Sequence, residues 1–218
     1  MSNPSAPVVT VVDYGIGNLY SVQRALETCG AQVELTADPA RIAQAQRLVL
    51  PGVGAFADGM QGLRERGLVK PLRDFAASGR PLLGICLGMQ MLASVSEEFG
   101  QHEGLDLVPG RVLPVPAQSV DGSRQKIPHI GWAPLLPTHG QASWQGSVLQ
   151  ASPSETAVYL VHSYAVVPSD PAHRLADCSH GGHLLCAALR RDNIHGCQFH
   201  PEKSGPAGLL MLSQFITL

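Results

Sequence analysis

The sequence predicts an α/β fold, with a central mixed sheet, mostly parallel, that is flanked by helices. In the N-terminal half, short β-branched segments alternate with segments of helical periodicity, which implies right-handed crossovers and helices on both faces of the sheet. Residues 8–12 form a continuous β-branched run, typical of a parallel strand buried on both faces. From about residue 105, prolines and short β-rich runs replace the helical patterns, which indicates antiparallel strands added to the same sheet.

The elements of the first half follow one another at short intervals. The strand at 8–12 leads through a turn at 13–18 to a helix over 19–29, which Gly30 ends. Further on, we expect a strand at 33–35, a helix at 39–45, a strand at 47–50, a glycine-rich loop at 51–54, and a helix at 68–77.

The remaining elements begin with a strand that ends in a turn around Cys86 and a helix over 89–94. A closing helix is predicted over 206–216. Between them the sequence predicts short strands at 111–113, 158–161, 184–189 and 196–199.

Length and charge limit the kind of protein this is. A chain of 218 residues without a linker or repeat predicts a single domain over 1–218. Its hydrophobic content of 44% and charged content of 15% are typical of a soluble globular protein. A net charge of −2 gives no electrostatic reason to expect a nucleic-acid or membrane partner.

The N-terminus and the cysteines predict a cytoplasmic location. Residues 1–7 have no basic or apolar region of a signal peptide, and no apolar run approaches the ~18 residues that span a bilayer. Five cysteines are an odd number without regular spacing, which favours free thiols in a reducing compartment.

The segment Gly84-Ile85-Cys86-Leu87-Gly88 is typical of a sharp strand-to-helix turn that lifts one side chain clear of a sheet edge. Glycines are needed there because other side chains would collide with the turn. A cysteine in that place lies at a helix N-terminus, whose partial positive charge favours a thiolate. Alone, the pattern fits a buried structural thiol equally well.

A nucleophilic cysteine needs a base and a group that orients the base, and the segment Phe199-His200-Pro201-Glu202 can supply both. After a strand, a turn at the proline lets the imidazole and the carboxylate lie on one side. Alone, these two residues fit a loop histidine and a solvated carboxylate. Together with Cys86 they predict a catalytic triad of Cys86, His200 and Glu202.

Acyl transfer also requires donors for a developing oxyanion. The backbone N–H of Leu87 is one candidate. A second is the loop Pro51-Gly52-Val53-Gly54, whose glycines let the backbone approach a substrate. An ordinary strand-to-helix turn is the alternative interpretation of this loop.

Two other patterns are weaker. Gly15-Ile16-Gly17 follows a strand, but Tyr20 leaves the dinucleotide-binding fingerprint incomplete. The spacing of Cys178, His180, His183 and Cys186 is not one common in structural zinc sites. A hairpin turn at Gly181-Gly182 is favoured instead, and no metal site is predicted.

With these residues in view, the chain resembles the class I (triad) glutamine amidotransferases, and among them the glutaminase subunits of imidazole glycerol phosphate synthases of histidine biosynthesis. The turn at Gly84-Ile85-Cys86-Leu87-Gly88 resembles the nucleophile elbow of the class, and His200-Pro201-Glu202 resembles its other two triad members. The narrower resemblance extends over most of the chain, and its segments are Asp13-Tyr14-Gly15-Ile16-Gly17-Asn18, Pro51-Gly52-Val53-Gly54-Ala55-Phe56, Lys126-Ile127-Pro128-His129-Ile130-Gly131-Trp132, Val161-His162-Ser163-Tyr164 and Phe199-His200-Pro201-Glu202-Lys203-Ser204.

The resemblance implies a flavodoxin-like fold and hydrolysis of L-glutamine through a γ-glutamyl thioester on Cys86, with no cofactor. By motif position, Gln90 and Glu98 would hold the α-amino and α-carboxyl groups of glutamine. The backbones of the glycine-rich loop and of the segment after Val161 would line the same pocket. The implied substrate-binding residues are Gly52, Val53, Gly54, Leu87, Gln90, Glu98, His162, Ser163 and Tyr164.

The resemblance further implies a heterodimer with a cyclase subunit of (βα)8-barrel fold. That partner would add the ammonia to a phosphoribulosyl aminoimidazole carboxamide intermediate, giving imidazole glycerol phosphate and an aminoimidazole carboxamide ribotide. One departure is Ala133, where the family usually has an asparagine after Gly-Trp. The positions that match subunit-interface residues are Asn18, Trp132, Tyr159 and Lys203.

Two alternatives stay open at the level of sequence. The chain could serve another synthase, such as anthranilate or aminodeoxychorismate synthase, although residues 126–132 are not expected there in this form. It could also be a non-catalytic regulatory subunit that has kept the fold, against which the intact triad argues.

Overall fold

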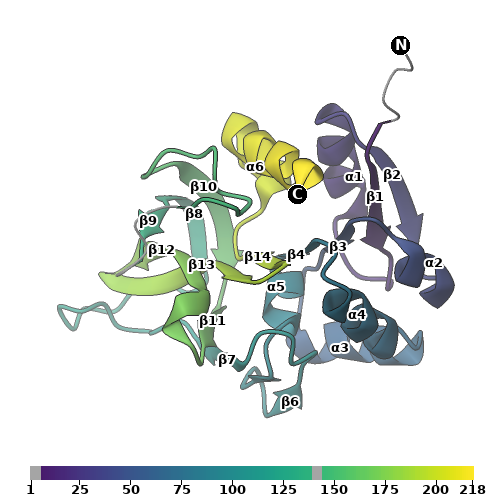
Figure 1. Cartoon of the computed structure of the whole chain (residues 1–218). Coiled ribbons are helices and arrows are strands. Elements are labelled where there is room, and N and C mark those ends of the chain that lie inside the picture. Colours follow the sequence, from purple (N-terminus) through teal and green to yellow (C-terminus); the bar gives the residue numbers. More distant parts are fainter. Residues whose placement is uncertain (1–5, 139–143) are drawn as a thin grey trace.

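A computed structural model describes residues 6–138 and 144–218 of the chain (Figure 1). The first five residues, which belong to the segment predicted to lack a signal peptide, lie outside the described part. Among the described residues, no helix has the length and apolar character needed to cross a membrane.

The predicted mixed α/β sheet is confirmed. In the described residues, an eight-stranded sheet has the order β2-β1-β3-β4-β14-β13-β12-β9. Its first five strands pair in parallel, and the last three are added in antiparallel pairing. The strands of this sheet are β1 (Val8–Val12), β2 (Gln32–Thr36), β3 (Leu48–Leu50), β4 (Leu82–Ile85), β9 (Leu136–Pro137), β12 (Arg174–His180), β13 (His183–Arg191) and β14 (Ile194–Cys197).

Helices cover both faces of the parallel strands, as predicted (Figure 1). On one face, Leu26 of α1 and Phe215 of α6 belong to the same core as Val9 of β1. On the other, Phe56 of α3 and Phe75 of α4 belong to the core that contains the alternate strand residues. The helices are α1 (Leu19–Thr28), α2 (Pro39–Gln44), α3 (Phe56–Glu65), α4 (Val69–Ala77), α5 (Leu87–Met91) and α6 (Gly205–Thr217), with short 3-10 helices η1 (Pro171–His173) and η2 (Pro201–Lys203).

The prediction that the strands of the second half extend one sheet is only partly right. β12 and β13 do so, and both contain runs of buried residues. Other strands form a four-stranded and a two-stranded sheet, and β10 shows why: buried and partly exposed residues alternate along it, typical of a sheet with one wetter face. These strands are β5 (Val95–Ser96), β6 (His102–Glu103), β7 (Gly110–Pro114), β8 (His129–Pro134), β10 (Ala157–His162) and β11 (Tyr164–Pro168).

The sequence patterns do not predict α3. The predicted start of α5 lies two residues after the observed start. Two glycines, Gly59 and Gly62, weaken the helical propensity of α3. They allow close packing instead, since a Cβ at Gly59 would lie 2.8 Å from the sulfur of Met91. The helix expected over 89–94 is α5, which begins at Leu87 directly after Cys86.

Candidate active site

Cys86 lies between β4 and α5 in a strained backbone conformation, with φ 53° and ψ −110°. A positive φ is unusual for a residue other than glycine and marks a strained turn. The neighbouring glycines are needed as predicted: a Cβ at Gly84 would lie 2.8 Å from the backbone of Gly88, and one at Gly88 would overlap the carbonyl of Leu50. The elbow therefore holds the thiol at the carboxyl end of the sheet, at the start of a helix.

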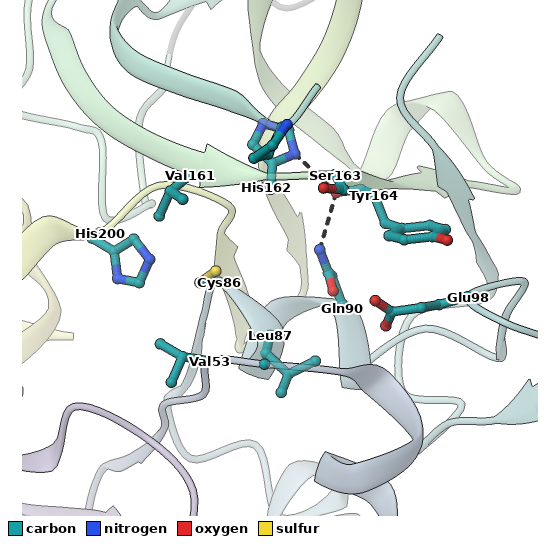
Figure 2. Close-up of a pocket in the computed structure, with 12 residues that line it drawn as sticks. Val53, Cys86, Leu87, Gln90, Glu98, Val161, His162, Ser163, Tyr164 and His200 are labelled. Atoms are coloured by element: carbon teal, nitrogen blue, oxygen red, sulfur yellow. Dashed lines mark hydrogen bonds between the residues drawn. The ribbon is translucent and has the colours of Figure 1, made fainter. Parts of the chain in front are cut away.

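His200 and Glu202 approach the elbow from the neighbouring strand β14, which pairs with β4. The chain leaves β14 and enters η2, where His200 Nδ1 lies 2.8 Å from Glu202 Oε1. Both side chains are almost completely buried. The other ring nitrogen, Nε2, lies on the side of Cys86 (Figure 2). Apart from the Cys86 sulfur, Nε2 has no hydrogen-bond partner among the described residues.

The charge state of His200 follows from these neighbours. Burial disfavours the imidazolium, but the hydrogen bonds and charges of Cys86 and Glu202 outweigh it and raise the pKa of His200 to about 9. At neutral pH the ring is therefore protonated. An imidazolium beside a cysteine can pair with its thiolate, which is the nucleophilic form.

The raised pKa of His200 predicts a pH dependence of stability. Because the unfolded value is about 6.5, this group contributes its full stabilisation below pH ~6.5 and loses it as the pH rises through about 9. We expect the melting temperature to fall over this interval, and His200→Gln to remove part of that fall. Thermal melts from pH 6 to 9.5 measure it. His183→Gln, at a partly exposed position, should keep the wild-type slope; an unchanged slope in His200→Gln would contradict the prediction.

The structure brings nearly all the predicted substrate-binding residues to one pocket, a cavity of about 270 Å³ (Figure 2). Such a volume suits a ligand as small as an amino acid. Of the predicted set, Gly52 alone is missing from the lining, and its carbonyl contacts Leu87 just beneath it. The lining consists of Val53, Gly54, Cys86, Leu87, Gln90, Glu98, Pro128, Val161, His162, Ser163, Tyr164 and His200.

A buried amide network lies under the nucleophile. Gln90 Nε2 donates to the carbonyl of Tyr164 at 3.0 Å and to Gln198 Oε1 at 3.1 Å. Gln198 in turn donates to the Cys86 sulfur at 3.8 Å. Sequence reasoning missed Gln198, although its position two residues before His200 gave a signal, since alternate residues of an extended segment share a face.

Glu98 connects the pocket to the start of α3. Its Oε2 accepts the N–H of Phe56, the first residue of α3, at 2.6 Å. The carboxylate therefore holds the start of a helix, where a negative charge is stabilised. The same side chain lines the pocket and offers a negative charge to a ligand there.

The two candidate oxyanion donors are not both available in this conformation. The N–H of Leu87 donates to the carbonyl of Gly52 at 3.3 Å. Because a trans peptide directs its C=O and N–H in opposite directions, the Val53 N–H of the same peptide points away from Leu87. Rotation of the Gly52–Val53 peptide would free one donor and turn the other inward.

Two of the predicted interface residues, Trp132 and Tyr159, belong to the β8–β10 sheet. Trp132 and Tyr159 are a cross-strand pair with ring centroids 6.0 Å apart, and Trp132 is 59% exposed. Asn18 is partly buried at the start of α1, and Lys203 is exposed in η2. Ala133 is buried in the core, so the side chain at this departure from the family pattern lies away from the Trp132 face.

Ser204 connects this sheet to the catalytic base. Its hydroxyl donates to the His200 carbonyl at 2.7 Å and accepts the Tyr159 N–H at 3.0 Å. The His200 N–H also donates to the Tyr159 carbonyl at 3.0 Å. The backbone positions of the base and of β10 are therefore fixed relative to each other.

The cysteine and histidine cluster considered for zinc does not assemble as one group. Gly181 and Gly182, both at positive φ, form the predicted two-residue hairpin between β12 and β13. Cys178 belongs to one core and Cys186 to the other, so their side chains occupy opposite faces of the sheet.

Comparison with known proteins gives the family. A profile of the family described as "Glutamine amidotransferase class-I" matches residues 10–218, almost the whole chain. The chain belongs to this family. The class I amidotransferase assignment agrees with the fold and accounts for a nucleophile elbow facing a histidine and glutamate pair.

Two similar curated proteins are both named as HisH subunits of imidazole glycerol phosphate synthase. "Imidazole glycerol phosphate synthase subunit HisH 1" of Legionella pneumophila strain Paris is 51% identical over 96% of this amidotransferase chain and 99% of its own. "Imidazole glycerol phosphate synthase subunit HisH" of Syntrophotalea carbinolica is 46% identical over 95% and 98%.

Solved structures support the fold of the amidotransferase at lower identity. A putative GMP synthase protein from Thermoplasma acidophilum superposes with a TM-score of 0.69 at 19% identity, over 99% of this chain and 94% of its own. A chain of the PurLQS structure from Thermotoga maritima gives a TM-score of 0.71 at 17% identity, over 97% and 98%.

Proposed function

We propose that this chain is the glutaminase subunit of an imidazole glycerol phosphate synthase and releases ammonia from L-glutamine for a partner subunit. The observation that carries the proposal is the triad of Cys86, His200 and Glu202 at a small pocket. Similarity over nearly the full length to proteins named as subunits of that synthase supports the choice of synthase. Five cysteines without a disulfide fit a cytoplasmic enzyme.

The first half of the reaction is acylation of the cysteine. The Cys86 thiolate attacks the γ-carbonyl carbon of glutamine, and the carbonyl oxygen becomes an oxyanion. The protonated His200 then gives its Nε2 proton to the leaving nitrogen, so that ammonia departs and a thioester remains. Glu202 accepts the Nδ1–H and keeps the ring in the orientation that this transfer needs.

The second half returns the enzyme to its starting state. The neutral His200 removes a proton from a water molecule, which attacks the thioester carbonyl. Collapse of the tetrahedral intermediate releases glutamate and regenerates the thiolate beside the imidazolium. The amide network under Cys86 keeps the sulfur in place through both steps.

A turn of the Gly52–Val53 peptide is proposed to complete the oxyanion site, because its carbonyl blocks the Leu87 N–H at rest. Proline at position 53 has no N–H to offer. We expect Val53→Pro to lower glutaminase kcat by roughly 10²–10³-fold, the usual effect of losing one oxyanion donor. Steady-state glutaminase kinetics in the presence of the partner measure this.

Val53→Ala is the matched control, since it shortens the side chain and keeps the backbone donor. It should retain most of the activity. Equal losses in the two variants would show that the Val53 side chain matters, rather than its N–H.

The exposed face of the β8–β10 sheet is proposed as the docking surface for the (βα)8-barrel cyclase subunit. It adjoins the pocket, because Val161 belongs to both, and aromatic residues are frequent anchors of interfaces. We expect Trp132→Ala to weaken the heterodimer by roughly 30-fold in Kd, equivalent to ~2 kcal/mol. Titration calorimetry measures this; Leu184→Ala, exposed on a different strand, should leave affinity unchanged.

A glutaminase assay with and without the barrel subunit and its ribonucleotide ligand tests the proposed function. We expect slow hydrolysis by the chain alone and faster hydrolysis in the complex. Activation by a chorismate-using partner instead would assign the chain to a different synthase. No labelling of Cys86 by a glutamine-mimicking electrophile in the complex would indicate a non-catalytic subunit.

A further inference from the structure

A second group of nucleophilic side chains adjoins the proposed glutamine pocket through His162, and it contains no member of the triad. His129 from β8, His162 from β10 and Cys178 from β12 are all buried. One potential ligand atom from each lies within 4.8 Å of the others. Three strands of two different sheets therefore converge on this point.

We propose that His129, His162 and Cys178 form a binding site for a thiophilic divalent transition-metal ion such as Zn²⁺. Two imidazoles and a thiolate are ligands that zinc prefers, and three protein ligands leave a fourth position for water. The site uses none of the three triad residues, and His162 is the one ligand that it shares with the lining of the proposed glutamine pocket.

The two histidines already have the spacing of a tetrahedral site. His162 Nε2 and His129 Nδ1 lie 3.3 Å apart. Two nitrogens at ~2.0 Å from a tetrahedral zinc ion are separated by roughly 3.3 Å. The sulfur of Cys178 lies within 4.8 Å of one ring nitrogen of each histidine, so a shift of roughly 1 Å completes the trio.

A second observation is the orientation of His162. Its Nδ1 lies 2.8 Å from the carbonyl of Tyr164, which can only accept a hydrogen bond (Figure 2). Nδ1 therefore carries the proton of the neutral ring, and the lone pair of Nε2 points into the cluster. A ring nitrogen fixed by a backbone carbonyl on its other side is the usual arrangement of a metal-binding histidine.

The protonation states fit a site that loads by releasing a proton. Burial lowers the pKa of His162 to about 4, and burial with the nearby His180 lowers that of His129 to about 4, so both rings are neutral. Burial and Asp177 raise the pKa of the Cys178 thiol to about 12. On binding, the S–H bond breaks, an S–metal bond forms, and its proton passes to solvent. His129 moves its proton from Nδ1 to Nε2.

The sequence pattern did not reveal this cluster because its members are far apart along the chain. The zinc pattern considered from the sequence included both Cys178 and Cys186, but Cys186 faces the other core. His180 stacks on His129 with ring centroids 4.2 Å apart, and its Nε2 donates to the carbonyl of Lys126. It thus covers the cluster from the side of the hairpin.

The experiment titrates Zn²⁺ and Co²⁺ into the full chain carrying Cys86→Ala, which removes the catalytic thiol as a competing ligand. We expect one bound ion per chain, one proton released per ion in buffers of different ionisation enthalpy, and a thiolate-to-cobalt charge-transfer band. Adding Cys178→Ser should abolish the band and weaken zinc binding by at least ~100-fold, the upper end of losses from a missing supporting residue.

Cys186→Ser in the same background is the matched control, because this buried thiol lies on the partner strand of the hairpin but outside the cluster. It should leave the band and the affinity unchanged. Should Cys178→Ser fail to fold by circular dichroism, His129→Gln provides the second test, with the same loss of affinity expected. No cobalt binding, a band that survives loss of Cys178, or an affinity that His129→Gln leaves unchanged would overturn the proposal. Neither the metal affinity nor the cobalt band depends on glutamine hydrolysis.

Discussion

Replacing Cys86 by alanine is expected to reduce glutamine hydrolysis by at least ~10⁴-fold, as deletion of a nucleophile does in other hydrolases. The thiolate is the only atom that forms a bond to glutamine in the proposed reaction, so no neighbouring group can take its place. The pocket walls are expected to stay as they are, because the substitution removes only the interactions of the thiol with Gln198 and His200. Glutamine binding should therefore survive.

The same variant separates the two activities of the proposed complex. Synthesis from added ammonium salts should continue at the wild-type rate, since that chemistry takes place on the cyclase subunit. Cys197→Ala, a buried thiol on the adjacent strand, is the matched control and should keep glutaminase activity. Retention of hydrolysis in Cys86→Ala would show that another group is the nucleophile.

How much of the fold is predictable depends on how local its determinants are. The buried strand at residues 8–12 carries its own signature, a β-branched run. The helix α3 does not, because Gly59 and Gly62 lower its propensity and are explained only by close packing against α5 and the turn after β1. The division of the later strands into separate sheets likewise depends on which faces meet water, a tertiary property.

The residues of the site likewise differ in how far local sequence patterns predict them. Cys86, with glycines two residues away on both sides, and the closely spaced His200 and Glu202 form local patterns with chemical meaning. Pro128 lines the same pocket without any local signal of its role, and the only local signal for Gln198 is its spacing from His200. The cluster of His129, His162 and Cys178 depends wholly on how three strands converge, which spacing along the chain does not reveal.

The tight turn around Cys86 leaves no room for a side chain at position 88. Gly88→Ala is therefore expected to destabilise the protein severely. A Cβ there would overlap the carbonyl oxygen of Leu50 at the end of β3. Backbone cannot move aside as a flexible side chain can, so either β3 or α5 has to shift. We expect a loss of ~3 kcal/mol or more in the free energy of unfolding, the upper end of overpacking costs. Urea denaturation measures it.

Gly62→Ala is the matched control, since it also places a methyl group on a helix next to backbone. The nearest atom there is the Tyr14 carbonyl oxygen at 3.0 Å, and the gain in helical propensity of ~1 kcal/mol offsets the small shift required. We therefore expect a change below ~1 kcal/mol. Similar stabilities of the two variants would mean that α5 can move away from β3. The elbow would then hold the thiol far less rigidly than a preorganised nucleophile requires.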